Sequence, residues 1–186
     1  MIGQNLLSES AIVIEEFVLE TLTPLMMHGW TRTKHEPAEV RIPSMKGVLR
    51  YWWRTLQDLP SKALFEEESA RFGSISGDQG RRSPVVFRLK YLVTDDNKAP
   101  ILPHRSTKKG ASNAIRPHRT LHLIMVHLKR DAESPGEGGL TLKEEHSLYV
   151  RWMLLLSGFG QRARRGAGAV QYEGFQWQSI TEIQKN

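Results

Sequence analysis

Glycines and arginines alternate in one short segment near the end of the chain, Ser157 to Val170, which reads SGFGQRARRGAGAV. Glycine permits positive φ angles and the close approach of another backbone. Arginine brings a permanent charge and a planar donor group that matches phosphate oxygens. The segment therefore predicts a loop that holds a polyanion, although a surface turn with solvated arginines is its simpler interpretation. Its glycines are Gly158, Gly160, Gly166 and Gly168, and its arginines are Arg162, Arg164 and Arg165.

A second group of cations lies in the segment PSMKGVLRYWWRTLQD, residues 43–58, which has the clearest helical pattern in the chain. We expect Ser44 to cap this helix and Met45, Leu49, Trp52 and Leu56 to form its apolar stripe. Lys46, Arg50 and Arg54 are four residues apart and share another face. An ordinary solvated face is the commoner explanation, but the lack of an acidic residue among the three favours an anion. Trp53 lies between the two faces, and we expect it to be packed.

Few residues are candidates for catalysis. His28 and His35, in the loop before this helix, together with Lys46 could support metal-independent RNA cleavage. Such residues are also common in basic loops that do not catalyse, so we predict no catalytic residue. Of the later histidines, we expect His118 and His122 on one face of a strand and His127 on the other. Because no metal-ligand spacing or cofactor motif occurs, we predict no metal and no cofactor.

The composition fits a protein that binds a polyanion. The chain has 186 residues, with 26 Lys and Arg against 20 Asp and Glu, a net charge of +6. This balance favours nucleic acid or an anionic surface as partner. With no cysteine, there are no disulfides and no thiolate metal site. No apolar run is long enough to cross a bilayer, and the N-terminus lacks a signal-peptide layout, so we expect a soluble cytoplasmic protein.

The periodicity along the chain predicts an α+β fold. We expect strands over 11–23, 84–93, 119–128 and 168–180, and helices over 43–58, 62–72 and 141–156. Thr141 and Glu144 form a capping-box pattern at the start of the last helix. The order indicates a ferredoxin-like (RRM-like) βαββαβ unit, an antiparallel sheet with its helices on one face and long loop insertions. We predict a single domain over 1–186, with a core of about 11–180 and an irregular, flexible basic insertion at about 95–117.

Three segments together resemble a known family. They are TLTP (residues 21–24), RIPSMKGVLRYWWRTL (residues 41–56) and GFGQRARRGAGAV (residues 158–170), and the segment Glu67–Ser74 adds to the match. They resemble the RAMP superfamily of CRISPR-associated proteins, and within it the family of the first-numbered subunit of the Cmr (type III-B) effector complex. The family commonly carries a second ferredoxin-like unit after the glycine-rich loop, whereas this sequence ends at Asn186.

The resemblance implies a subunit of a crRNA-guided antiviral ribonucleoprotein that is not the one credited with target cleavage. Its implied partners are crRNA and/or single-stranded target RNA and other Cmr-complex subunits, with no membrane. The RNA-binding candidates are Arg41, Lys46, Arg50, Arg54, Gly158, Gly160, Arg162, Arg164, Arg165 and Gly166. Two alternatives stay open: a metal-independent RAMP endoribonuclease that processes guide RNA, and a basic protein-interaction module whose arginines meet acidic neighbours.

Overall fold

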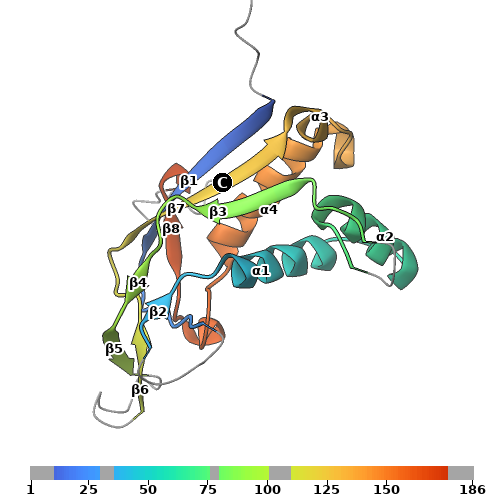
Figure 1. Cartoon of the computed structure of the whole chain (residues 1–186). Helices are drawn as coiled ribbons and strands as arrows, with labels where there is room; N and C mark the ends of the chain where they lie inside the picture. The colour runs from blue at the N-terminus through green and yellow to red at the C-terminus, as the bar shows by residue number, and fades with distance from the viewer. Residues whose placement is uncertain (1–10, 30–35, 76–79, 101–109, 176–186) are drawn as a thin grey trace, which may run out of the picture.

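A four-stranded antiparallel sheet forms the centre of the fold. Its strands are β1 (Ile12–Thr21), β3 (Val85–Leu89), β7 (Thr120–Leu128) and β8 (Val170–Tyr172), in the spatial order β3-β7-β1-β8 (Figure 1). With α1 after the first strand and α4 after the third, this is the predicted ferredoxin-like βαββαβ order, so the fold class is confirmed. The computed structural model describes residues 11–29, 36–75, 80–100 and 110–175.

Alternation along the two central strands decides which face of the sheet is buried. β1 pairs with β7 from Ile12 opposite Leu128 to Glu20 opposite Thr120. Because successive side chains point to opposite faces, Phe17 and Leu19 enter the core while Ile14 stays 57% exposed. The buried face of the sheet is thus apolar, and the other face is open.

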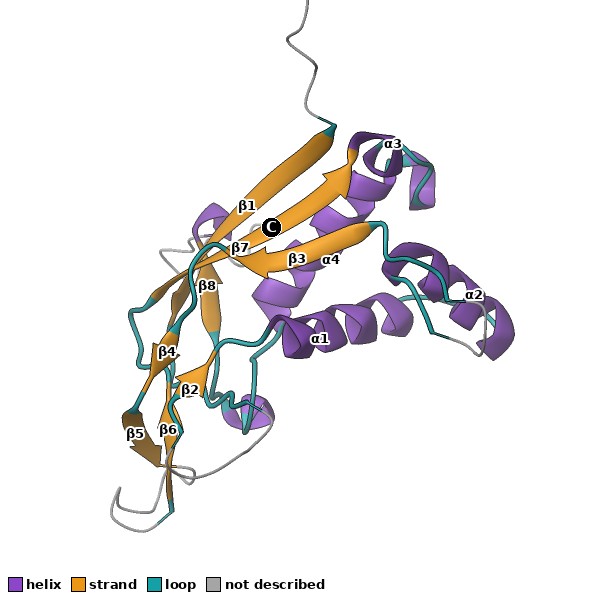
Figure 2. Ribbon diagram, in the orientation of Figure 1, coloured by secondary structure: helices purple, strands orange, loops and turns teal. Residues whose placement is uncertain are grey.

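The helices cover the buried face only (Figure 2). α1 spans Ile42–Thr55 and α4 spans Leu142–Leu156, and α2 (Ser61–Phe72) continues from the far end of α1. Met45 and Leu49 of α1 and Met153 of α4 meet Phe87 and Leu123 of the sheet around one small cavity. A short helix α3 (Lys129–Ala132) follows β7. The basic face of α1 is therefore positioned by a helix that its apolar side fixes to the sheet.

Two details of α1 differ from the prediction. The helix begins at Ile42, with Arg41 at its N-cap and no side-chain cap, so the prediction of Ser44 as cap is wrong. Pro43 explains this start, since proline is accommodated in the first turn of a helix. The buried stripe runs through Trp53, which is fully buried, while Leu56 lies beyond the helix and is 45% exposed. At the start of α4, the predicted capping box of Thr141 and Glu144 is confirmed.

The segment Thr94–Pro117, predicted to be irregular, contains three short strands. β4 (Thr94–Asp95) pairs with β2 (Ala38–Glu39), and β5 (Asn97–Pro100) pairs with β6 (Ala111–Ala114). These strands lack apolar alternation, which explains why the pattern missed them. Asp95 accepts two bonds from the Arg116 guanidinium, at 2.8 and 3.0 Å, and this contact lowers the pKa of Asp95.

The last predicted strand is shorter than expected. β8 ends at Tyr172 and a 3-10 turn, Glu173–Phe175, follows it, so the prediction of strand through residue 175 is wrong. Residues 176–180 of that prediction, and residues 101–109 of the predicted flexible insertion, lie outside the described residues. The domain boundaries stay a prediction. Within the described ranges, no helix is long and apolar enough to cross a membrane.

A pair of buried histidines links the sheet to α4. His127 Nε2 lies 2.8 Å from His146 Nδ1, and His146 Nε2 lies 3.1 Å from the Arg71 carbonyl oxygen. These contacts fit one relay, in which His127 donates to His146 and His146 donates to the carbonyl. Burial lowers the pKa of His127 to about 4 and that of His146 to about 3. His122 contacts Glu16 on the open face, opposite His127, whereas His118 lies in a turn before β7 rather than on the strand.

We expect this histidine pair to make the protein less stable in mild acid. Both rings stay neutral in the native state, whereas an unfolded histidine protonates near pH 6.5. The unfolded state therefore binds more protons, and the free energy of unfolding falls as the pH drops from about 6.5 to about 5. The charged groups that face the two rings also shift their pKa values, and these groups are Glu15, Lys46, Arg71, Asp131 and Lys143.

Urea unfolding at a series of pH values measures the effect. The double variant His127→Gln, His146→Gln serves as the control and is expected to flatten the profile between pH about 6.5 and about 5, because most carboxylates titrate below that window. A parent profile that is already flat over this window would contradict the assignment of neutral rings.

Candidate nucleic-acid interface

The glycine-rich loop that follows α4 closes on itself. The Phe159 N–H donates to the Gly168 carbonyl oxygen (2.9 Å), and Gly158 forms an isolated bridge with Ala169. The Phe159 side chain is 1% exposed and fixes the loop to the core. At the start of the loop, Trp52 of α1 donates to the Ser157 hydroxyl (2.5 Å). Both ends of the loop are therefore fixed to the core, while its middle stays at the surface.

The glycines are needed for the packing of the loop against the segment Pro24–Met26. The Gln161 N–H donates to the Met26 carbonyl oxygen (2.8 Å), and the Gly168 N–H donates to that of Pro24 (3.0 Å). Gly160 has φ +81°, and a Cβ there would lie 2.4 Å from the Met26 oxygen. Of the four glycines, the prediction of RNA contact covers Gly158, Gly160 and Gly166, and it remains a prediction. The observed role of Gly160 is to let the loop approach the protein's own backbone closely at Met26.

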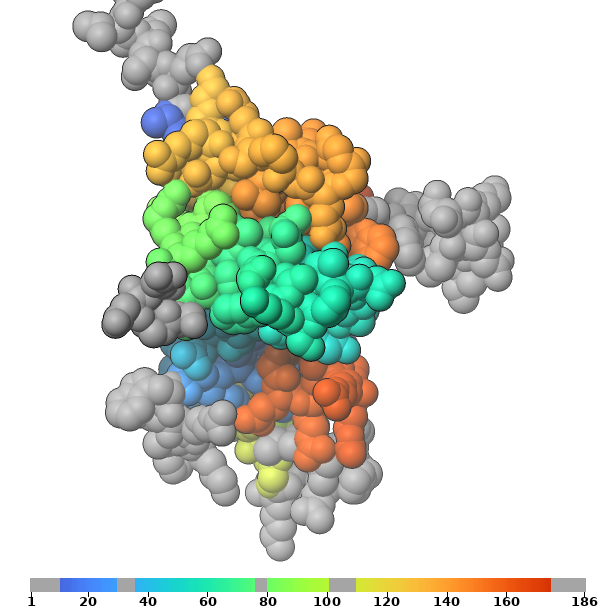
Figure 3. Space-filling view, turned by 90° about the vertical axis from the view of Figure 1, so that its right-hand side faces the viewer, coloured from blue at the N-terminus to red at the C-terminus, as the bar shows by residue number. Residues whose placement is uncertain are grey.

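The three loop arginines project from this fixed backbone into solvent. Arg162 has a positive φ of 61°, and Ala163–Arg165 form a 3-10 turn that Gly166 ends. Arg162, Arg164 and Arg165 are exposed, and none pairs with a carboxylate of the described residues. The loop, orange-red in Figure 3, lies below the α1–α2 pair on the same side of the molecule. An ordered backbone thus presents unneutralised guanidinium groups.

The far end of the α1 face does have an acidic partner. Arg50 donates to Glu68 Oε1 at 2.5 Å, and Arg54 donates to both oxygens of Glu68 at 3.2 and 3.3 Å. Glu68 comes from α2 and is only 4% exposed, so packing between the helices supplies the acidic partner that the α1 sequence itself lacks. One carboxylate faces two guanidinium groups, so Glu68 alone does not neutralise both arginines.

Lys46 lies one helical turn before Arg50 and has a different environment. It is half-buried and borders the small cavity between α1 and the sheet. No described carboxylate pairs with it, and burial, followed by the charge of Arg50, lowers its pKa. Because loss of water disfavours the charged form, an anion placed beside Lys46 would restore that charge.

Arg41 joins the start of α1 to the segment that supports the loop. Its guanidinium donates to the His28 carbonyl oxygen (3.3 Å) and lies 3.5 Å from Glu39 Oε1. The structure therefore brings Arg41 and the glycine-rich loop to adjoining parts of Met26–His28. At a rise of about 1.5 Å per residue, Arg54 lies about 20 Å farther along α1. The predicted cations of α1 are therefore divided between its two ends: Arg50 and Arg54 pair with Glu68 of α2, whereas Arg41 contacts the segment that supports the loop. Figure 1 shows α2 at the far end of α1.

Two of the three candidate catalytic residues, His28 and Lys46, are described, and each has its own contacts. His28 Nε2 lies 3.2 Å from the Ser112 hydroxyl of β6, whereas Lys46 borders the cavity under α1. His35 lies outside the described residues. Among the residues that are described, no group of three His, Asp or Glu side chains could hold a metal ion.

Two residues near the basic end of α1 were missed by sequence reasoning. Arg81 is exposed and borders two pockets, and Phe65 is a half-exposed aromatic of α2. Phe65, Glu68 and Phe72 are spaced at helical intervals, which could have revealed that the acidic and aromatic residues of α2 face α1 together.

Comparison with known proteins identifies the family. The model of the RAMP superfamily matches residues 18–171, so the chain belongs to the RAMP superfamily, as the resemblance indicated. One relative is the CRISPR system Cmr subunit Cmr1-2 of Pyrococcus furiosus, which is 29% identical over 191 residues, 84% of this chain and 94% of the relative.

Solved structures show the same fold at low identity. The crystal structure of apo Cmr1 from Pyrococcus furiosus matches with a TM-score of 0.60 and 21% identity over 92% of this chain. A chain of the type III-B Cmr-β complex bound to cognate target RNA matches with a TM-score of 0.53, 15% identity and 88% coverage of this chain. A chain of a type IV-B CRISPR complex also matches at 0.53, with 12% identity, 90% of this chain and 94% of its own length covered. The chain spans 53% of the Cmr1 chain and 59% of the Cmr-β chain.

Proposed function

We propose that this chain is a non-catalytic, RNA-binding subunit of a cytoplasmic type III-B CRISPR (Cmr) ribonucleoprotein. It would hold crRNA and/or target RNA mainly through the phosphate backbone, beside other Cmr subunits. Membership of the RAMP superfamily, the identity with Cmr1-2 and the fold of a chain from an RNA-bound complex support this function.

One observation carries the proposal: Arg162, Arg164 and Arg165 are free cations on an ordered loop. Because the loop backbone is already fixed, binding phosphate has to order only the arginine side chains and not the backbone that carries them. Phosphate contacts position a nucleic acid without reading its sequence, which suits a protein that must accept guides of different sequence. Arg41 and Lys46 extend the same surface along the first turns of α1.

We also propose that the chain does not cleave RNA. The His28 ring is hydrogen-bonded to the Ser112 hydroxyl, whereas Lys46 borders the cavity between α1 and the sheet, and the described residues show no hydrogen bond between these two candidates. We expect repeat RNA incubated with the pure chain in EDTA to remain intact. A single cut that disappears in His28→Ala would instead establish the endoribonuclease alternative.

The salt dependence of RNA binding tests the backbone-directed mode. The logarithm of the binding constant for a single-stranded RNA is expected to fall with the logarithm of salt concentration with a slope of about −0.7 per phosphate contacted. Contacts from the three loop arginines alone predict a slope of about −2. Fluorescence anisotropy of a labelled RNA at several salt concentrations measures it. A slope near zero, or no RNA binding at moderate salt, would contradict the proposal.

A further inference from the structure

A pocket of about 460 Å³ lies at the α2 end of the basic surface. Arg50 of α1, Phe65 of α2 and Arg81 of the following loop line it, with Ser74 and Ser83 between them. Its volume is in the range of small-ligand sites. Phe65 is 50% exposed although it lies on the same side of α2 as buried Glu68 and Phe72. An aromatic residue thus lines an open pocket together with two arginine residues.

The backbone that carries Arg81 is fixed. Ser74 and Arg81 exchange two backbone hydrogen bonds, of 3.0 and 2.8 Å. Gly73, with φ +76°, lets this pair pack closely, since a Cβ there would lie 2.7 Å from the Ser83 nitrogen. The Arg81 side chain nevertheless pairs with no carboxylate of the described residues. Its position is therefore set while its charge is free.

Arg50 is held in place on the opposite wall. Its Nε donates to Glu68 Oε1, and the buried carboxylate receives Arg54 as well. This arrangement leaves the terminal nitrogens of Arg50 without a described partner. Glu68 therefore fixes the orientation of Arg50 without neutralising the pair of arginines completely.

The geometry points to a nucleotide-binding pocket for single-stranded RNA, in which a base stacks on Phe65 and its phosphate binds Arg81 and Arg50. The inference rests on the proposed RNA-binding function and adds a base contact to it. Stacking on an aromatic ring accepts any base, so the pocket requires no particular sequence. It would extend the RNA path from the glycine-rich loop along α1 to the end of α2.

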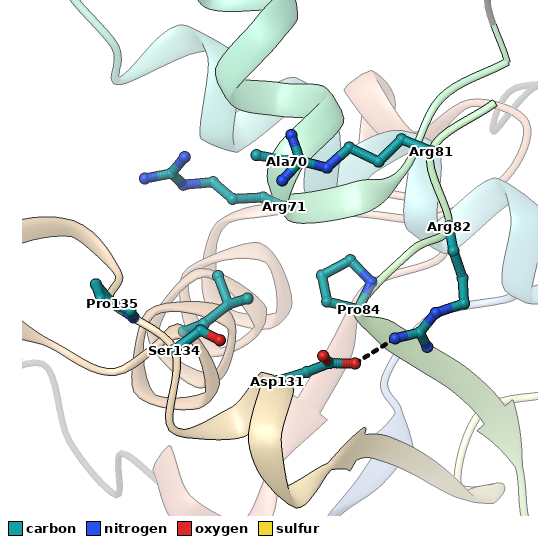
Figure 4. A pocket seen from close by; sticks show the side chains of 9 residues that line it. Ala70, Arg71, Arg81, Arg82, Pro84, Asp131, Ser134 and Pro135 are labelled. Carbon is teal, nitrogen blue, oxygen red and sulfur yellow. Dashed lines mark hydrogen bonds and ion pairs between the residues drawn. The ribbon is translucent and has the colours of Figure 1, made fainter. Parts of the chain in front are cut away.

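The neighbouring arginine provides a matched control. Figure 4 shows that Arg81 and Arg82 diverge: Arg82 turns to Asp131, while Arg81 extends along α2 toward Ala70. Arg82 Nη2 lies 2.5 Å from Asp131 Oδ2, and Arg82 does not line the Phe65 pocket. Replacing either arginine by glutamine removes one positive charge, but only Arg81 lines the Phe65 pocket, whereas Arg82 lines only the neighbouring pocket beside Asp131.

Binding of a labelled oligouridine RNA and of inorganic polyphosphate to the full chain tests the inference. Phe65→Ala is expected to weaken RNA binding about 5- to 100-fold and to leave polyphosphate binding unchanged, because only RNA has a base to stack. Phe65→Trp should bind RNA as tightly as the parent. Arg81→Gln should weaken both ligands more than Arg82→Gln does. Ultraviolet cross-linking followed by mass spectrometry should attach a uridine to Phe65.

Failure of this inference differs from failure of the proposed function. If the parent binds RNA and Phe65→Ala binds it equally well, or if Arg81→Gln and Arg82→Gln have equal effects, the pocket is not a nucleotide site. If the parent binds no RNA, the proposed function itself fails. Thermal unfolding of Phe65→Ala checks its fold, and Arg81→Gln tests the site without changing an apolar contact.

Discussion

Glu145→Ala is expected to lower the free energy of unfolding by about 3 to 5 kcal/mol, the usual loss when one partner of a buried ion pair is removed. Glu145 is 1% exposed. Its Oε1 accepts from Arg71 Nε (2.5 Å) and Trp53 Nε1 (3.2 Å), and its Oε2 accepts from the Glu137 N–H (2.9 Å). The substitution leaves the Trp53 donor and the Glu137 N–H without this acceptor, and it leaves Arg71 with only the more exposed carboxylates of Glu67 and Glu137.

The neighbouring residue supplies the control for this prediction. Glu144→Ala removes the same group from the exposed capping box and is expected to lose about 1 kcal/mol. Urea unfolding of both variants at neutral pH gives the comparison. Equal losses would show that Glu145 does not join α1, α2 and α4 through its buried contacts.

Gly168→Ala is expected to destabilise the protein by about 3 kcal/mol or more and to abolish tight RNA binding. Gly168 has φ +69°, a conformation that costs an alanine about 1 to 2 kcal/mol. A Cβ there would also lie 1.9 Å from the Phe159 carbonyl oxygen, so the backbone of the loop must move. Because the loop arginines depend on that backbone, their positions change with it.

Gly166→Ala is a control that has the backbone strain of a positive φ angle without the steric conflict expected for Gly168→Ala. Gly166 has φ +83°, but nothing lies within 4 Å of a Cβ placed there. Only the conformational penalty of about 1 to 2 kcal/mol is expected at this position. Unfolding and RNA-binding measurements on both variants decide the matter, and a Gly168→Ala protein as stable as Gly166→Ala would contradict the packing described for the loop.

The core of the fold could be predicted from the sequence because its signals are local. Alternation in β1 and the 3.6-residue period of α1 each identify an element without knowledge of its neighbours. The strands β5 and β6 carry no such signal. They are held by pairing with each other, by buried Ala99 and Ala114, and by the Asp95–Arg116 contact, which joins residues 21 positions apart.

The candidate site was predicted less completely, because charge partners are tertiary features. Arg50 and Arg54 have no acidic neighbour within α1, and only the packing of α2 against α1 brings Glu68 to them. The loop after α2 places Arg81 at the pocket that Phe65 also lines, and this loop has no periodicity that could have predicted the arrangement. The residue types and their spacing predicted a basic surface. Which of its cations pair with a carboxylate, and which do not, could be seen only in the structure.

The two ends of this surface suggest how an extended RNA would be accommodated. The loop end offers free arginines with Arg41 beside them, and the α2 end offers Arg50, Arg81 and an aromatic ring. A single strand that follows α1 would contact phosphates at both ends. Cations at such a distance from each other fit an extended polymer better than a small anion.

RNA binding by the full chain with Arg164→Glu and Arg165→Glu tests the central claim most directly. The control carries Arg88→Glu and Arg130→Glu, which change the net charge equally at exposed arginines of the open sheet face and of α3. The loop variant is expected to bind single-stranded RNA about 100-fold more weakly than the parent, with its salt slope reduced by about 1.4 and its stability nearly unchanged. Equal weakening by the two variants would contradict the claim that the glycine-rich loop binds RNA.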